Sequence, residues 1–326
     1  LAMQRQVDPT GLSSARVLVA LGTVASNLGQ EKQSVAYFQE SLDVFQQMGD
    51  RGNAALAANM LGRGAAWDYD FSRAQNYYGQ ALAWYQAIGQ RKGEADTQRY
   101  LADLALMLGQ YEAARERLTA VLETYHAIED KRSIGTTLTR LSLVHHYLGD
   151  EQTAVQQAEA ALAIAAEVGN PLLRAYGLSS LGHGLRGQGE WERATAVYTE
   201  AIALWDELDM ISLKVEAEAA LAAVFLAAGR PDDSWLLLET AVGYLIANPQ
   251  PDCEALGQLY LDCITLLQAK GDDERARLLL QQAVETLRRQ AARIADAAAQ
   301  SAFLDEVAAH HRLLALHARA TTASAQ

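Results

Sequence analysis

The stretch Leu181–Ala201 reads LGHGLRGQGEWERATAVYTEA and decides the fold. Within it, Ala194, Tyr198 and Ala201 recur at the spacing of one face of an α-helix. Gly189 stands just before that helix, where the preceding helix has to end. Glycine suits such a join because a helix commonly ends on a residue with positive φ, where a Cβ atom is penalised. The stretch therefore predicts two helices joined by a tight turn.

The same pattern recurs along the chain with a period of 40 residues. A second series of turn residues lies half a period away, so a turn is expected every 20 residues. Each repeat is therefore predicted to be a helical hairpin, and such hairpins bury their apolar faces by stacking into a solenoid. The recurring residues are the leucines Leu21, Leu61, Leu101, Leu141, Leu181 and Leu221, the turn glycines Gly29, Gly109, Gly149, Gly189 and Gly229, and the second glycine series Gly49, Gly89 and Gly169.

Two positions depart from the first series of turn glycines. Tyr69 replaces the turn glycine of the second repeat. A tyrosine at positive φ is strained, so the turn Asp68–Asp70 is expected to differ in shape from the others. The last turn, at Gly271, follows after 42 residues, and the two extra residues are assigned to the Pro/Asn segment 248–251.

The composition supports helices and argues against several functions. Half of the 326 residues are hydrophobic but only 7% are aromatic and 5 are prolines, as in Ala/Leu-rich helical proteins. A formal net charge of −13 without a concentrated basic segment argues against nucleic-acid binding. The chain has no signal-peptide pattern and no run of about 18 apolar residues, so we expect a cytoplasmic protein without a membrane span. Cys253 and Cys263 have neither a zinc-site spacing nor that of a disulfide framework.

These recurrences resemble tetratricopeptide repeats, whose usual period is about 34 residues. The longer unit here gives each helix nearly one more turn. The resemblance implies an all-α, right-handed α-α superhelix of seven hairpins with a concave binding face, spanning residues 1–290. The repeats are expected at about 12–50, 51–90, 91–130, 131–170, 171–210, 211–250 and 251–290. The motif residues are Leu181-Gly182, Gly189-x-Trp191, Ala194-x-x-x-Tyr198 and Ala201 in the fifth repeat, and Leu61-Gly62, Phe71, Ala74, Tyr78 and Ala81 in the second.

The long repeat also resembles the superhelical sensor domains of bacterial multidomain signalling ATPases, including maltose-responsive transcription activators. Residues 301–316 are similar to the closing helix that often caps such arrays, which implies a capping helix at 291–320 and a tail at 321–326. In that group a nucleotide-binding module precedes the repeats, and this sequence contains no phosphate-binding Gly-x-x-x-x-Gly-Lys-Ser/Thr motif. The sequence is thus expected to be either an excised sensor region or a free-standing repeat protein.

The sequence gives little support to catalysis, a metal site or a cofactor. None of its histidines has the His-x-x-x-His spacing with an accompanying Glu of a helical metal site. Gly182-x-Gly184-x-x-Gly187 matches a dinucleotide fingerprint, but no strand precedes it, so close helix packing is the better interpretation. We therefore expect a protein that binds without catalysing a reaction.

The first helices of the repeats are expected to line the concave face. Polar and aromatic residues concentrate there in the second to fifth repeats, and the arginines among them can bind carboxylates or phosphates. They suit a protein or peptide, or a small anionic or sugar-like ligand. A constitutive scaffold or self-assembling module that forms homo-oligomers is the alternative. The candidate residues are Asn59, Arg63, Trp67, Arg99, Asp103, Met107, Thr139, His146, Tyr147, Ser179, His183 and Arg186.

Overall fold

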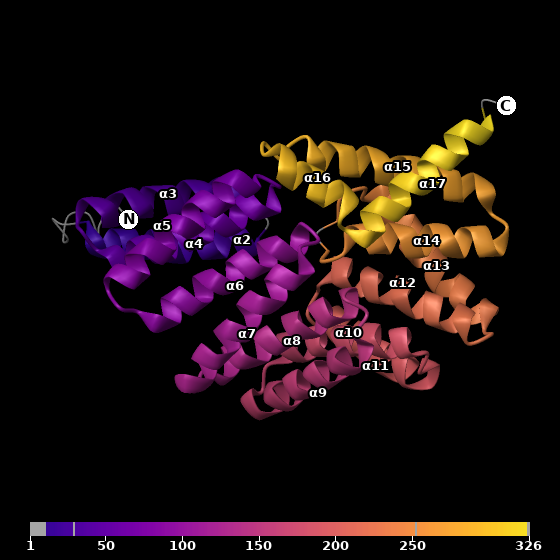
Figure 1. Cartoon of the computed structure of the whole chain (residues 1–326), viewed down its shortest axis with the longest axis horizontal. Helices are drawn as coiled ribbons and strands as arrows, with labels where there is room; N and C mark the ends of the chain where they lie inside the picture. The colour runs from indigo at the N-terminus through magenta and orange to yellow at the C-terminus, as the bar shows by residue number, and fades with distance from the viewer. Residues whose placement is uncertain (1–10, 29, 252, 325–326) are drawn as a thin grey trace.

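The computed structural model describes residues 11–28, 30–251 and 253–324. This part of the chain contains α-helices and no strands, so the all-α superhelix expected from the sequence is confirmed. Figure 1 shows the helices following one another along a strongly curved path. Helix pairs fill the expected repeats: α2 (Leu12–Asn27) and α3 (Glu31–Gln47), α4 (Arg51–Trp67) and α5 (Phe71–Ala87), α6 (Arg91–Met107) and α7 (Tyr111–Ala127), α8 (Lys131–Tyr147) and α9 (Glu151–Val168), α10 (Pro171–Gln188) and α11 (Trp191–Glu207), α12 (Ile211–Ala227) and α13 (Pro231–Ala247), and α14 (Leu256–Lys270) and α15 (Asp273–Ala291).

Residues in the left-handed backbone conformation end the helices at the predicted turns. The glycines at 49, 89, 109, 149, 169, 189, 229 and 271 all have φ between 62° and 81°, whereas Gly29 lies outside the described residues. Tyr69 has φ 61°, so the prediction that its turn differs in shape was wrong. Contacts from the C-terminal helices hold Tyr69 in this strained conformation, as described below. Glu129 and Asp209 adopt the same left-handed geometry, each with φ 56°.

In repeats one, two and five the hairpin is closed by an aromatic ring that packs on a glycine of the facing helix. A Cβ atom added to Gly62 would lie 2.5 Å from the Tyr78 ring, and one added to Gly182 would lie 2.6 Å from the Tyr198 ring. The rings therefore occupy the space that a side chain would need. Gly184 packs in the same way against Val155, which confirms close helix packing as the role of this glycine-rich segment.

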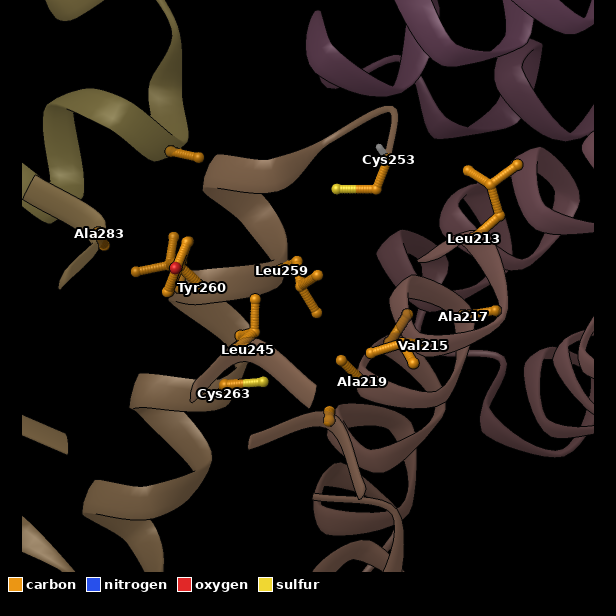
Figure 2. Close-up of a cluster of buried hydrophobic side chains, with 14 of the residues drawn as sticks. Leu213, Val215, Ala217, Ala219, Leu245, Cys253, Leu259, Tyr260, Cys263 and Ala283 are labelled. Atoms are coloured by element: carbon orange, nitrogen blue, oxygen red, sulfur yellow. The ribbon is translucent and has the colours of Figure 1, made fainter. Parts of the chain in front are cut away.

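The hydrophobic core runs from repeat to repeat along the superhelix. Figure 2 shows Val215 and Ala219 of α12 beside Leu259 and Cys263 of α14, with Leu245 of α13 between the two repeats. All five side chains are buried. Repeats six and seven therefore share one core although the α13–α14 connection is longer than the others.

The C-terminal cap, which we define as α16 (Ala297–Asp305) and α17 (Ala308–Ser324), follows the last repeat. The single capping helix expected from the sequence is thus two helices. α17 extends to Ser324, so residues 321–324 of the expected tail are helical. Figure 1 shows α17 crossing α14 and α15, while α16 reaches back towards the first repeats. The cap therefore covers the last repeat and also contacts the second and third.

An aromatic cluster fastens the cap to the second repeat. The Tyr69 and Phe303 rings lie 5.7 Å apart in an edge-to-face arrangement, and Phe71 lies 6.3 Å from Phe303. Gln290 of α15 donates a 2.7 Å hydrogen bond to the Tyr69 hydroxyl. We call these four residues the aromatic clasp. Because the clasp joins residues more than 200 positions apart, it closes the curved chain on itself.

Candidate functional site

A cavity of about 590 Å³ lies on the concave side, between the first helices of repeats two to four and the C-terminal part of the chain. The repeat wall comes from α4, α6 and α8. The C-terminal wall consists of residues 253–258 at the start of α14 and of Phe303 and residues 307–310 from the cap. The volume lies within the usual range for pockets that hold small molecules.

Seven of the candidate residues from the sequence line this cavity. They project from consecutive turns of the three helices of the repeat wall, as expected for the inner face of a superhelix. Trp67 is the most exposed aromatic residue among them, at 51%. The seven are Arg63, Trp67, Arg99, Asp103, Met107, His146 and Tyr147.

A network of ion pairs joins the two walls. Asp103 accepts a 3.2 Å hydrogen bond from Arg99 Nη1, and its other carboxylate oxygen lies 3.4 Å from Arg140 Nε. Arg140 also pairs with Glu254 of the C-terminal wall. The neighbouring carboxylates outweigh the effect of burial and raise the pKa of Arg140 above its ordinary value. Both arginines are therefore charged and fixed in place by carboxylates.

Arg63 differs from these two arginines because no carboxylate of the described residues pairs with it. Its guanidinium lies 5.8 Å from the centre of the Tyr100 ring, and Nη1 lies 3.6 Å from the Met60 sulfur. Tyr100 in turn stacks on Tyr78 at 5.6 Å. Arg63 thus presents a charged guanidinium to the cavity. Aromatic and sulfur atoms flank this guanidinium.

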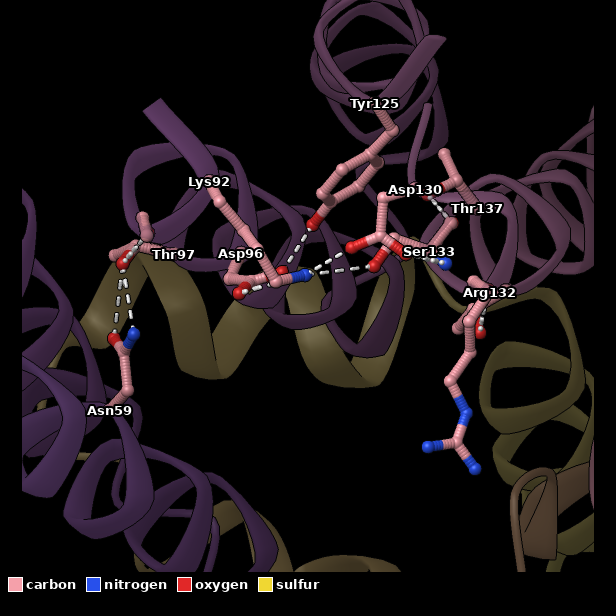
Figure 3. Close-up of polar contacts among 11 residues, drawn as sticks. Asn59, Lys92, Asp96, Thr97, Tyr125, Asp130, Arg132, Ser133 and Thr137 are labelled. Carbon is pink, nitrogen blue, oxygen red and sulfur yellow. Dashed lines mark hydrogen bonds and ion pairs between the residues drawn. The ribbon is translucent and has the colours of Figure 1, made fainter. Parts of the chain in front are cut away.

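Asn59 does not face the cavity. It is 2% exposed, and its Nδ2 donates a 2.9 Å hydrogen bond to Thr97 Oγ1, which joins α4 to α6 (Figure 3). Thr139 is buried too, and its hydroxyl donates to the carbonyl of Gly135. Asn59 thus joins two first helices, whereas the Thr139 hydroxyl is satisfied within its own helix, and neither residue lines the cavity.

The candidates of the fifth repeat lie apart from the large cavity. Ser179 and His183 line a separate space of about 20 Å³, enough for one water molecule. Burial, together with the charges of His146 and Arg186, lowers the pKa of His183 to about 3. Arg186 forms two hydrogen bonds with Asp262, of 2.8 and 2.7 Å, which satisfy its guanidinium. Arg186 therefore joins α10 to α14.

A partly buried carboxyl group supports the C-terminal wall from behind. Glu216 of α12 accepts backbone hydrogen bonds from Glu254, at 3.0 Å, and from Ala255, at 3.4 Å. Burial, and secondly the negative charge of Glu254, raise the pKa of Glu216 to about 8. The Glu216 carboxyl is thus mainly protonated at pH 7, and it fixes the backbone from which Glu254 reaches Arg140.

Sequence reasoning missed several residues of the site. Tyr100 and Arg140 each precede a ladder leucine and line the cavity. Each lies seven residues before a candidate residue, Met107 or Tyr147, so the two side chains of each pair point only about 20° apart on a helix of 100° per residue. A wider choice of repeat positions would have included both. Glu254 and Phe303 carried no such signal, because they reach the cavity only when the superhelix curves back on itself.

Two other kinds of site are absent from the described residues. No group of three or more His, Cys, Asp or Glu side chains in that part of the chain could hold a metal ion. None of its helices is long and apolar enough to cross a membrane.

The fold and the cavity define a helical-repeat superhelix with a ligand-sized space on its concave side. Family models described as tetratricopeptide repeat match residues 93–167 and 15–54. These two segments thus match the tetratricopeptide-repeat pattern that the recurrences indicated.

Several solved structures share this superhelix. The apo form of RapI matches with a TM-score of 0.66 and 14% identity, over 85% of this chain and 98% of that one. NprR in complex with its cognate peptide NprX matches with a TM-score of 0.59 and 15% identity, over 82% and 76%. A signal transduction ATPase with a tetratricopeptide-repeat sensor, from Pyrococcus horikoshii, matches with a TM-score of 0.58 and 14% identity, over 83% of this chain and 41% of that one. At these identities the likeness concerns the fold.

Among curated proteins, the regulatory protein AfsR of Streptomyces griseus is 26% identical over 225 residues. The matched region covers 60% of this chain but 23% of AfsR. This chain therefore corresponds to about a quarter of that relative's length.

Proposed function

We propose that this protein is a recognition module that binds a short peptide or a small ligand in its concave cavity without catalysing a reaction. The observation that carries the proposal is the cavity of about 590 Å³ in which arginines and aromatic side chains converge. Pockets of this size with a few placed polar groups are typical of ligand sites. NprR, which shares the fold, is described in complex with a peptide.

The occupied module is proposed to act as the sensor of a larger regulatory protein. Support comes from AfsR, a regulatory protein, and from the Pyrococcus horikoshii ATPase whose sensor consists of tetratricopeptide repeats. The two walls of the cavity come from distant parts of the chain, so a ligand that contacts both would favour their closure. Such a difference in affinity between closed and open forms is what a sensor requires.

The test is a thermal-shift screen of metabolites and short peptides with a matched pair of variants. Ala308 lines the cavity and is exposed, whereas Ala298 is exposed on α16 away from the cavity. A true ligand should raise the melting temperature of the wild type and of Ala298→Trp but not that of Ala308→Trp. Hits that stabilise all three proteins equally would place binding elsewhere and refute the proposal.

A further inference from the structure

The charges that line the cavity do not balance. Three guanidinium groups and two carboxylates line it, so the lining carries one excess positive charge, although the whole chain has a formal net charge of −13. A cationic site inside an acidic protein attracts anions that the outer surface repels. The lining residues concerned are Arg63, Arg99, Arg140, Asp103 and Glu254.

Glu216 and His310 leave this balance unchanged at neutral pH. Glu216, behind the C-terminal wall, has a pKa raised to about 8 by burial and by the charge of Glu254, so it adds little negative charge. Burial lowers the pKa of His310 to about 4, and this lining residue is therefore neutral. The excess positive charge thus stays with the arginines.

The three arginines differ in whether a carboxylate already pairs with them. Arg99 and Arg140 are already paired with Asp103, and Arg140 also with Glu254, so an incoming anion would have to compete with these carboxylates. Arg63 has no such competitor among the described residues and is exposed. Its guanidinium can therefore offer two parallel N–H groups to a carboxylate.

Flat apolar surfaces lie beside Arg63. Trp67 follows one helical turn later on α4 and is 51% exposed, so an indole ring is open to solvent beside the cation. Tyr100 forms the other flank, 5.8 Å from the guanidinium. Trp67 also lines the cavity, so its exposed ring borders the space that a ligand would occupy. A flat group on the ligand would cover this ring while its acid group reaches Arg63.

We propose that the cavity selects ligands with a single carboxylate next to a flat apolar group, and that Arg63 binds the carboxylate. This inference rests on the proposed function and names its ligand chemistry. A monoanion neutralises the one excess charge, whereas a phosphate dianion would leave an uncompensated negative charge beside Asp103 and Glu254. A peptide that ends in an aromatic residue and a free aromatic acid share this chemistry.

The experiment compares acids with their neutral amides by isothermal titration calorimetry. The probes are N-acetyl-tryptophan against N-acetyl-tryptophanamide, and the peptide Gly-Gly-Gly-Trp with a free against an amidated C-terminus. The acids should bind the wild type at least about tenfold more tightly than the amides, the expected effect of one charge-assisted pair. Arg63→Gln should remove this preference. Arg51→Gln, at the far end of α4 and outside the cavity lining, should retain it.

Each outcome decides the inference. Equal binding of acid and amide, an unchanged preference in Arg63→Gln, or no binding of any probe would overturn it. If acid and amide bind equally but Ala308→Trp loses both, the cavity remains a ligand site and only the carboxylate inference fails. If only the peptide acid shows the preference, the ligand is a peptide terminus; if both acids show it, a free acid suffices.

Discussion

At the residue scale, the helical glycines divide into two kinds. Gly62 faces the Tyr78 ring with no space for a Cβ atom, whereas a Cβ atom on Gly64 of the same helix would lie 3.7 Å from Val35, an ordinary contact. The packing of this hairpin therefore requires glycine at position 62 and merely accepts it at position 64.

This difference predicts opposite effects of the same substitution. Gly62→Ala should destabilise the protein by about 1–3 kcal/mol because it overpacks the hairpin. Gly64→Ala should stabilise it by about 0.5–1 kcal/mol through helix propensity. Urea denaturation of the two variants beside the wild type measures both effects. A stability gain in Gly62→Ala would mean that Tyr78 moves aside freely.

The raised pKa of Glu216 predicts a pH dependence of stability. An unfolded Glu ionises near 4.5, whereas the folded group ionises near 8. Between these values the folded state binds more protons, so this group's contribution to stability falls as pH rises, by at most about 1.4 kcal/mol per pH unit. Glu216→Gln keeps a backbone acceptor and should lose this dependence. Denaturant titrations at pH 5 and pH 8 test this; parallel losses in both proteins would contradict it.

At the element scale, the turn at Tyr69 explains a departure from the repeat pattern. Its left-handed backbone costs on the order of 1 kcal/mol for a residue other than glycine. The aromatic clasp offsets this cost, because Phe303 and Gln290 contact the Tyr69 side chain. Tyr69 thus lies at the turn that contacts the C-terminal helices, where the chain closes on itself.

Glycine substitutions separate backbone strain from the clasp. Glu129→Gly relieves the same left-handed strain at an exposed turn, and should stabilise the protein by about 0.5–1 kcal/mol. Tyr69→Gly relieves the strain too but loses the aromatic contacts, each about 0.5–1.5 kcal/mol beyond buried area, and should be net destabilising. Hydrogen exchange should accelerate in α16 of Tyr69→Gly and not of Glu129→Gly. Unchanged protection of α16 would show that the clasp does not hold the cap.

The cap could not be predicted to the same depth as the repeats. The spacing of apolar residues and glycines gave the hairpins, since each packs mainly against its neighbours in sequence. The seven cavity residues of the repeat wall followed from the same periodicity. Asn59 and Arg186 were misplaced because burial and pairing with Thr97 and Asp262 depend on tertiary packing. The C-terminal wall depends on the curvature of the whole array, which accumulates from small rotations between repeats.

At the scale of the whole molecule, closure by the clasp predicts a compact particle. Phe303 is 2% exposed, and Phe303→Ala should cost about 3–5 kcal/mol and increase the radius of gyration as the cap separates from the second repeat. Leu278→Ala, at a residue 52% exposed on α15, is the matched control. Small-angle X-ray scattering with light scattering measures size and mass together. An unchanged radius in a folded, monomeric Phe303→Ala protein would rule out a closing role for the clasp.

The two-walled cavity also has a consequence for the order in which the protein is made. The repeat wall is complete once residue 147 has left the ribosome, but the C-terminal wall needs residues up to 310. At about 5–20 residues per second of synthesis, this gap lasts on the order of ten seconds or more. During that interval the lining residues Tyr100 and Tyr147 have no opposite wall, so the growing chain carries an aromatic surface that its own last helices later cover in part.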